Sequence, residues 1–201
     1  MAALEEKFAQ IRMDHTAAIR VRSARALLGS SVIRVFYPGT KGPLLRKLAS
    51  LEIESLHTIR SQEAFRRKFE EQLSEVHSTV RRLNVGNGRI HPGAKWGHST
   101  KVLCLHLREL MLHSRLLQDA AVARLQHYLY TPIDGIVLNE LRRASVAIPF
   151  RRIKDIRSAR GFYSLQKILG DAARREGVPR VWFDDVWAIR EGDVQHQTRK
   201  S

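Results

Sequence analysis

Residues 99–117 read STKVLCLHLRELMLHSRLL, and this stretch decides the fold. Apolar side chains fill most of its positions, and charged residues interrupt them only at intervals. A helix of this length makes about five turns, and a helix that is apolar around most of its circumference is buried around most of it. We therefore predict that residues 99–117 form the central helix, with the other elements packed around it.

The segments on both sides of this helix also carry apolar residues at helical intervals. Residues 2–28 predict one long helix that ends at Gly29-Ser30-Ser31, and a second marked helix begins at Ser61. The inner stripe of that second helix consists of Phe65, Phe69, Leu73, Val76 and Val80. We expect further helices over residues 44–59, 120–129, 131–144, 161–176 and 181–190.

Two segments do not fit a helix. Residues 32–37, VIRVFY, are rich in β-branched and aromatic residues, but no second run of this kind is present to pair with them, so we expect an extended segment packed on helices. Residues 84–97, NVGNGRIHPGAKWG, contain four glycines and a proline and predict an ordered functional loop. The fold class expected is all-α, an irregular bundle of about seven to nine helices.

Length and composition indicate a single globular unit. The chain has 201 residues, of which 43% are hydrophobic and 27% charged, enough for one substantial core. We expect one helical domain over residues 1–192 and a flexible tail over residues 193–201. The lone cysteine, Cys104, excludes an intramolecular disulfide, and no stretch approaches a signal peptide or a membrane span. An intracellular protein, cytoplasmic or nucleoid-associated, is the expectation, with no membrane contact.

Positive charge is the strongest compositional feature. The chain carries 35 Lys and Arg residues against 20 Asp and Glu, a net charge of +15, and residues 12–47 and 142–160 hold 13 of the excess charges. Most of the excess is arginine, whose planar guanidinium pairs with phosphate through two hydrogen bonds. We expect nucleic acid as the partner, with the two basic stretches on either side of a cleft. Solubility, an acidic protein partner and an anionic membrane surface remain alternative explanations of the charge.

The motifs of several enzyme classes are absent from the sequence. It contains no phosphate-binding Gly-rich loop ending in Lys-Ser or Lys-Thr, no HExxH, no GxSxG and no paired cysteines. The nine histidines do not form a metal-binding pattern, because His98, His106 and His113 share a helix side only loosely and lack an acidic companion. We expect neither a metal nor a cofactor.

Lys101 and Asp134 form the more informative pair. Lys101 lies in the first turn of the most apolar helix, so its stem is expected to point into the interior, and burial favours the neutral amine that a nucleophile needs. Asp134 follows Thr131 and Pro132 at a helix start, where Thr131 is the expected N-cap and Asp134 the third helical residue. A lysine that extends to solvent and a plain capping aspartate remain the structural alternatives.

The tract WGHSTK at residues 96–101, followed by TPID at residues 131–134, resembles the lysine and Pro-Val-Asp segments of the helix-hairpin-helix superfamily of base-excision DNA glycosylases. The resemblance covers about residues 85–145 and is greatest to the archaeal 8-oxoguanine branch, in which the lysine and the aspartate are further apart than in the usual members. The Leu-Pro-Gly-Val-Gly hairpin of the family is missing here, and residues 90–93, IHPG, stand in its place.

In that superfamily the lysine attacks the sugar C1′ after a damaged base is flipped out of the helix, and the aspartate stabilises the developing charge. The resemblance therefore implies a DNA-glycosylase-like fold, Lys101 as the Schiff-base nucleophile and Asp134 as its electrostatic partner. It also favours DNA over RNA as the substrate.

A flipped base needs a stacking surface and phosphate contacts, because flipping costs on the order of a few kcal/mol. Our candidates for the base pocket are Trp96, Tyr128, Tyr130 and Phe150. Our candidates for phosphate binding are Arg89, Lys95, Arg142, Arg143, Arg151, Arg152, Lys154 and Arg157. Core packing of the aromatic residues and a solvated basic face are the alternatives.

Two functions are consistent with the sequence. The first is a base-excision DNA glycosylase/lyase that uses Lys101 and Asp134. The second is a non-catalytic helical module that binds nucleic acid or a protein partner, in which Lys101 and Asp134 form a structural ion pair.

Overall fold

The computed structural model describes residues 2–28, 36, 39–83, 85–86, 89–90, 96–113 and 116–188, and it confirms the all-α class. Eight α-helices lie within these residues: α1 (Ala2–Leu28), α2 (Lys41–Ala49), α3 (Gln62–Leu83), α4 (Trp96–Arg108), α5 (Asp119–Leu125), α6 (Gly135–Arg143), α7 (Ala159–Glu176) and α8 (Trp182–Ala188). Three short helical turns are η2 (Glu54–Thr58), η3 (Glu109–His113) and η4 (Ile153–Asp155). The strands β1 (Val85–Gly86) and β2 (Arg89–Ile90) form a two-residue antiparallel pair.

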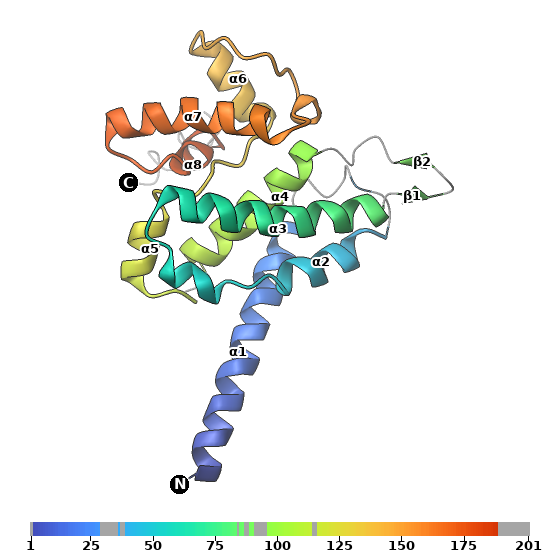
Figure 1. Ribbon diagram of the computed structural model, residues 1–201, viewed down its shortest axis with the longest axis vertical. Coiled ribbons are helices and arrows are strands. Elements are labelled where there is room, and N and C mark those ends of the chain that lie inside the picture. Colours follow the sequence, from blue (N-terminus) through green and yellow to red (C-terminus); the bar gives the residue numbers. More distant parts are fainter. Residues whose placement is uncertain are drawn as a thin grey trace, which may run out of the picture.

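Helix α4 lies at the centre, between α3, the C-terminal part of α1 and the turn η4 (Figure 1). Most of its residues are buried, and η3 continues it as a π-helical turn. His106 lies on its buried side and hydrogen-bonds the carbonyl oxygen of Leu48 in α2 at 3.0 Å. Burial lowers the pKa of His106 to about 4, so this imidazole is neutral near pH 7 and acts as a hydrogen-bonding group of the core.

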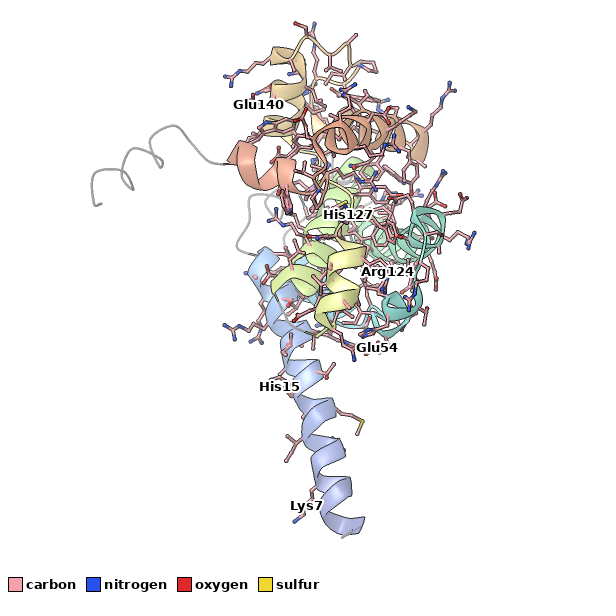
Figure 2. The ribbon with its side chains drawn as sticks, turned by 90° about the vertical axis from the view of Figure 1, so that its left-hand side faces the viewer. Lys7, His15, Glu54, Arg124, His127 and Glu140 are labelled. Carbon is pink, nitrogen blue, oxygen red and sulfur yellow. The ribbon has the colours of Figure 1, made fainter. Side chains whose placement is uncertain are left out.

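The two basic stretches do not border a common cleft. Helices α1 and α2, which carry the first stretch, lie on one side of α3 and α4, and α6 with the loop that follows it lies on the other side (Figure 1). Figure 2 shows the same order from the side, with Lys7 and His15 on the part of α1 that extends away from the bundle and Glu140 of α6 at the opposite end. The layer formed by α3 and α4 therefore separates the two positive surfaces.

An aromatic cluster joins the central helices to α7. The ring of Phe162 stacks on Phe69 at 5.8 Å, and the rings of Trp96 and Tyr130 meet Phe162 edge-on at 5.7 and 5.4 Å. Edge-to-face and offset contacts of this kind stabilise a core beyond the area that they bury. The cluster therefore fixes the position of α7 against α3 and of Trp96 at the start of α4.

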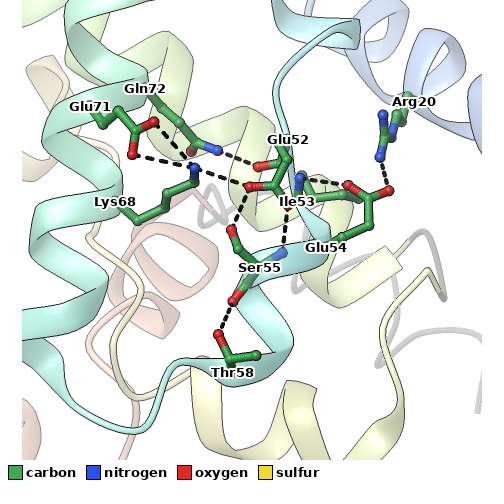
Figure 3. Close-up of polar contacts among 9 residues, drawn as sticks. All are labelled: Arg20, Glu52, Ile53, Glu54, Ser55, Thr58, Lys68, Glu71 and Gln72. Atoms are coloured by element: carbon green, nitrogen blue, oxygen red, sulfur yellow. Dashed lines mark hydrogen bonds and ion pairs between the residues drawn. The ribbon is translucent and has the colours of Figure 1, made fainter.

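The helix expected over residues 44–59 is divided in two. Helix α2 ends at Ala49, and η2 begins only at Glu54. Between them the Glu52 carboxylate accepts from the amide and the hydroxyl of Ser55, at 2.6 and 2.5 Å, and pairs with Lys68 of α3 at 3.0 Å (Figure 3). Burial opposes ionisation, but these hydrogen bonds outweigh it and lower the pKa of Glu52 to about 2. Local capping and a contact to α3 thus replace the helical bonds.

None of the helices in the described part of the chain combines the length and the apolar character that a membrane span requires. The expected extended segment at residues 32–37 lies outside the described residues except for Phe36, which is buried and packs edge-on against His98 at 6.3 Å. The expected tail, residues 193–201, also lies outside the described residues.

Candidate functional site

Lys101 and Asp134 meet in the structure. The Nζ atom of Lys101 lies 3.1 Å from Oδ2 of Asp134, and the two side chains are 13% and 21% exposed. Lys101 belongs to the second turn of α4, and Asp134 comes from the segment that leads into α6. Two residues separated by 33 positions thus form one partly buried ion pair that remains in contact with solvent.

Asp134 is the N-cap of α6, and each of its two carboxylate oxygens has a separate task. Oδ1 accepts from the backbone amides of Ile136 and Val137 at 2.8 and 3.0 Å, while Oδ2 faces Lys101. A carboxylate at this place satisfies amides that have no partner within the helix and interacts favourably with the helix dipole. The cap therefore holds the carboxylate in a fixed orientation toward the lysine.

The helix starts at Gly135, three residues after the position expected for its first residue. Thr131, the expected N-cap, is fully buried and bonded elsewhere: its hydroxyl donates to the Arg180 carbonyl oxygen at 2.7 Å, and its amide donates to Gln166 Oε1 at 3.0 Å. The side chain of Gln166 also donates to the Thr131 carbonyl oxygen at 2.7 Å. These tertiary bonds keep residues 131–133 out of the helix, and the cap moves to Asp134.

The buried Arg180 holds the residues just before this segment in place through hydrogen bonds. The guanidinium of Arg180 donates to the carbonyl oxygens of Leu129 and Tyr128, both at 2.8 Å, and to Gln62 Oε1 at 2.9 Å. It also lies 4.3 Å above the ring of Tyr130. Burial lowers the pKa of Arg180, because the charged guanidinium loses its hydration, and the neighbouring Tyr130 opposes this shift. Arg180 thus links α3, the segment before Asp134 and α8.

The second basic stretch docks on the first turn of α4. The amide of Gly97 donates to the carbonyl oxygen of Ile156 at 3.0 Å, and a Cβ atom on Gly97 would lie 2.4 Å from the carbonyl oxygen of Ile153. Gly97 and Lys101 are four residues apart and therefore share one side of the helix. The basic loop consequently contacts α4 one turn before the lysine.

Gly97→Ala is expected to push residues 153–156 away from α4, because the added methyl group meets backbone atoms that have no rotamer to change. We expect a loss of about 1–3 kcal/mol in the free energy of unfolding, measured by urea titration. Gly135→Ala is the matched control, since a Cβ atom there meets nothing within 4 Å. Equal stabilities of the two variants would contradict the close contact.

The predicted phosphate contacts divide into three groups. Arg151, Arg152, Lys154 and Arg157 are exposed on the loop around η4. Arg142 donates to Asn139 and to the carbonyl oxygens of Phe150 and Arg151, so it ties this loop to α6, and Arg143 pairs with Glu140 at 2.7 Å. Arg89 contributes backbone to β2, its side chain lies outside the described part, and Lys95 lies outside the described residues altogether.

The predicted base pocket does not form as one surface. Tyr130 is only 4% exposed, and the rings of Phe65, Phe69, Phe162 and Tyr163 surround it, so it is a core residue and not a stacking surface. Tyr128 donates its hydroxyl to the Arg60 carbonyl oxygen at 2.9 Å, on the side of η2. Phe150 packs against Gly161 at the start of α7. Trp96 borders a pocket between α3 and the start of α7.

Sequence reasoning did not identify Gly97, Gln166 or Arg180, which build the frame of the site. Gly97 follows a glycine-rich tract, and Arg180 follows a proline in a turn, so both resemble ordinary loop residues in the sequence. The described residues contain no cluster of His, Cys, Asp and Glu that would bind a metal ion. Burial raises the pKa of the Cys104 thiol far above its ordinary value, which makes this residue inert core.

Comparison with known proteins gives no match: no family model, no curated protein and no solved structure is significantly similar to this chain.

Proposed function

We propose that this protein acts on DNA as a base-excision glycosylase/lyase, with Lys101 as the nucleophile and Asp134 as its electrostatic and proton-transfer partner. The observation that carries the proposal is the 3.1 Å pair of Lys101 Nζ and Asp134 Oδ2, in which the aspartate also caps the helix that follows. Resemblance to the helix-hairpin-helix glycosylases led us to expect this pairing of lysine and aspartate.

The surroundings of the pair support an anionic substrate. Four exposed cations, Arg151, Arg152, Lys154 and Arg157, lie on the loop that docks one helical turn from Lys101. Such a loop contacts phosphates through charge-assisted hydrogen bonds and positions a strand without reading its sequence. The partial exposure of Lys101 and Asp134 leaves the pair open to a sugar that is presented from this side.

The chemistry balances around the two side chains. The Lys101 ammonium passes one proton to Asp134, and the lone pair of the amine attacks C1′ as the bond from C1′ to the base breaks. The departing base takes the bonding pair and receives that proton, which leaves Asp134 ionised again. The attached nitrogen then passes a proton to Asp134. This proton moves to O4′ when the C1′–O4′ bond opens, which leaves a protonated imine between Lys101 and the sugar.

One observation favours the second function, a module that binds DNA or a protein without catalysis. The direct contact of Lys101 with Asp134 is the geometry of many structural ion pairs, and the capping role of Asp134 needs no substrate. In that case the pair links α4 to α6, and the basic loop alone makes the nucleic-acid contacts.

Borohydride trapping tests the proposal directly, because hydride reduces the imine to a stable protein–DNA bond. Duplexes carrying either 8-oxoguanine or an abasic site are incubated with the full chain, and the adduct is resolved by denaturing electrophoresis. We expect an adduct with wild type and none with Lys101→Ala. Lys7→Ala and Lys167→Ala, which remove exposed lysines of α1 and α7, are the matched controls and should retain it.

The control variants matter because exposed lysines of a basic protein also react with abasic sites. An adduct that persists in Lys101→Ala refutes the assigned nucleophile. The absence of an adduct on both substrates, with salt-sensitive DNA binding intact, would replace the enzyme with the non-catalytic module.

A further inference from the structure

A second surface feature lies on the other side of α4. A pocket of about 370 Å³ is formed by one stripe of α3 from Glu70 to Arg81, by Trp96 at the start of α4 and by Ala159 at the start of α7. The Glu70 carboxylate pairs with Arg66 at 3.0 Å and lies about three turns of α3 away from Arg81. Ser99 of α4 faces this side, because its hydroxyl lies 3.0 Å from His77 Nδ1. Gly97 and Lys101 instead face the loop around η4 and α6, so the pocket is separate from the Lys101–Asp134 pair.

The pocket offers an aromatic ring that is held in place. Trp96 is half-buried, and its indole meets Phe162 edge-on at 5.7 Å, while Phe162 stacks on Phe69 behind it. A ring that is fixed from one side and borders a pocket on the other stacks a planar ligand without losing rotamer freedom. Leu73 of α3 adds an apolar residue to the lining.

The pocket also offers a cation and neutral hydrogen-bonding groups. Arg81 is exposed, and it makes no hydrogen bond or ion pair with the described residues. Its charge lies close enough to His77 that burial and Arg81 together lower the pKa of that imidazole, which is therefore neutral at physiological pH. The hydroxyls of Ser74 and Ser78 complete this part of the lining.

These groups match one class of ligand. A planar heteroaromatic ring fits the indole, an attached anion fits the guanidinium of Arg81, and the hydroxyl and imidazole groups fit a sugar or base edge. An acidic peptide would use Arg81 but not the ring, and a hydrophobic ligand would leave the polar groups without partners. A nucleotide uses the ring, the guanidinium and the neutral polar groups, while the Glu70 carboxylate keeps Arg66 as its partner.

We propose that the pocket between α3, α4 and α7 binds a nucleoside monophosphate unit, with the base on Trp96 and the phosphate on Arg81. The unit is either a free nucleotide or one residue of a DNA strand, since both present the same ring and the same phosphate. The proposal does not require catalysis by Lys101.

The test measures binding of three probes to the full chain by isothermal titration calorimetry: dAMP, deoxyadenosine and a single-stranded ten-residue deoxyadenosine oligonucleotide. We expect Arg81→Gln to weaken dAMP binding about tenfold, the effect of losing one charge-assisted contact, and to leave deoxyadenosine binding unchanged. Trp96→Leu should weaken both by about tenfold or more, because stacking serves the base. Arg67→Gln, an exposed arginine of α3 outside the pocket, is the matched control.

The probes also distinguish the two sources of the ligand. Binding of dAMP with a weaker oligonucleotide indicates a free nucleotide, and tighter oligonucleotide binding with the same effects of Arg81→Gln and Trp96→Leu indicates a strand. The effects of Arg81→Gln and Trp96→Leu on dAMP binding should be the same whether or not Lys101 is present. No saturable binding of any probe, or equal effects of Arg81→Gln and Arg67→Gln, would overturn the proposal whatever the outcome of borohydride trapping.

Discussion

Arg180→Met is expected to lower the free energy of unfolding by about 3–5 kcal/mol. Methionine has a similar length but donates no hydrogen bond, so the carbonyl oxygens of Tyr128 and Leu129 and the side chain of Gln62 all lose a donor in a buried place. Each buried acceptor that is left without a partner costs about 1–3 kcal/mol. Removing the guanidinium also removes the unfavourable free energy of burying its charge. The expected loss of stability is therefore smaller than the sum of the costs for the three acceptors.

Urea titration followed by circular dichroism measures this effect, with two comparison variants. Arg180→Lys keeps the charge but lacks the planar fork that reaches several acceptors at once, so an intermediate loss of about 2 kcal/mol is expected. Arg175→Met removes an exposed arginine near the end of α7 and should change stability by about 0.5 kcal/mol or less. If Arg180→Met were as stable as Arg175→Met, the network would contribute nothing measurable.

The helices themselves were largely predictable, because each depends on a local pattern. The expected starts of α1 and α3 agree with the structure, and Ser61 caps α3 by accepting from the Ala64 amide at 3.1 Å. Gly177 ends α7 in the left-handed conformation, with φ of 68°, which glycine adopts without strain. The apolar stripe of α3 is buried as predicted, from Phe65 to Val80.

The boundaries that were wrong are those that tertiary contacts decide. Glutamate is common in helices, yet Glu52 lies outside α2, because its side chain bonds to Ser55 and Lys68 instead. Thr131 has the sequence context of an N-cap, yet Gln166 and Arg180 occupy its amide and hydroxyl. Lys68 lies 16 residues from Glu52, and Gln166 and Arg180 lie 35 and 49 residues from Thr131, so a local sequence pattern does not contain these contacts.

The contact between the two residues of the candidate site was expected, and the residues that surround them were not. The resemblance to the helix-hairpin-helix glycosylases led to the expectation that Lys101 and Asp134 lie together, and they are 3.1 Å apart. The aromatic residues were harder to place, since a tyrosine in the core and a tyrosine in a pocket have the same sequence signature. Tyr130 packs into the core, where Arg180, a residue 50 positions later, contacts its ring.

Asp134→Asn is expected to separate the structural role of the ion pair from its catalytic role. The asparagine oxygen replaces Oδ1 and keeps the two capping bonds, but its NH₂ group then faces the Lys101 ammonium, donor against donor. We expect a stability loss of about 1–2 kcal/mol, against about 2–3 kcal/mol for Asp134→Ala, which loses the cap as well. The rate of adduct formation should fall at least about 100-fold in Asp134→Asn, because the proton acceptor is gone.

The double variant Lys101→Met/Asp134→Asn decides between the two roles. Methionine removes the ammonium that opposes the asparagine NH₂, so the double variant should regain about 1 kcal/mol relative to Asp134→Asn, and the cycle measures the coupling of the pair. If the pair is purely structural, DNA binding and stability recover together in the double variant. Borohydride trapping is then the same in wild type and in all variants. If the pair is catalytic, the double variant recovers stability but still forms no borohydride adduct. Stability recovers because the two donor groups no longer oppose each other, whereas catalysis needs both the amine and the carboxylate.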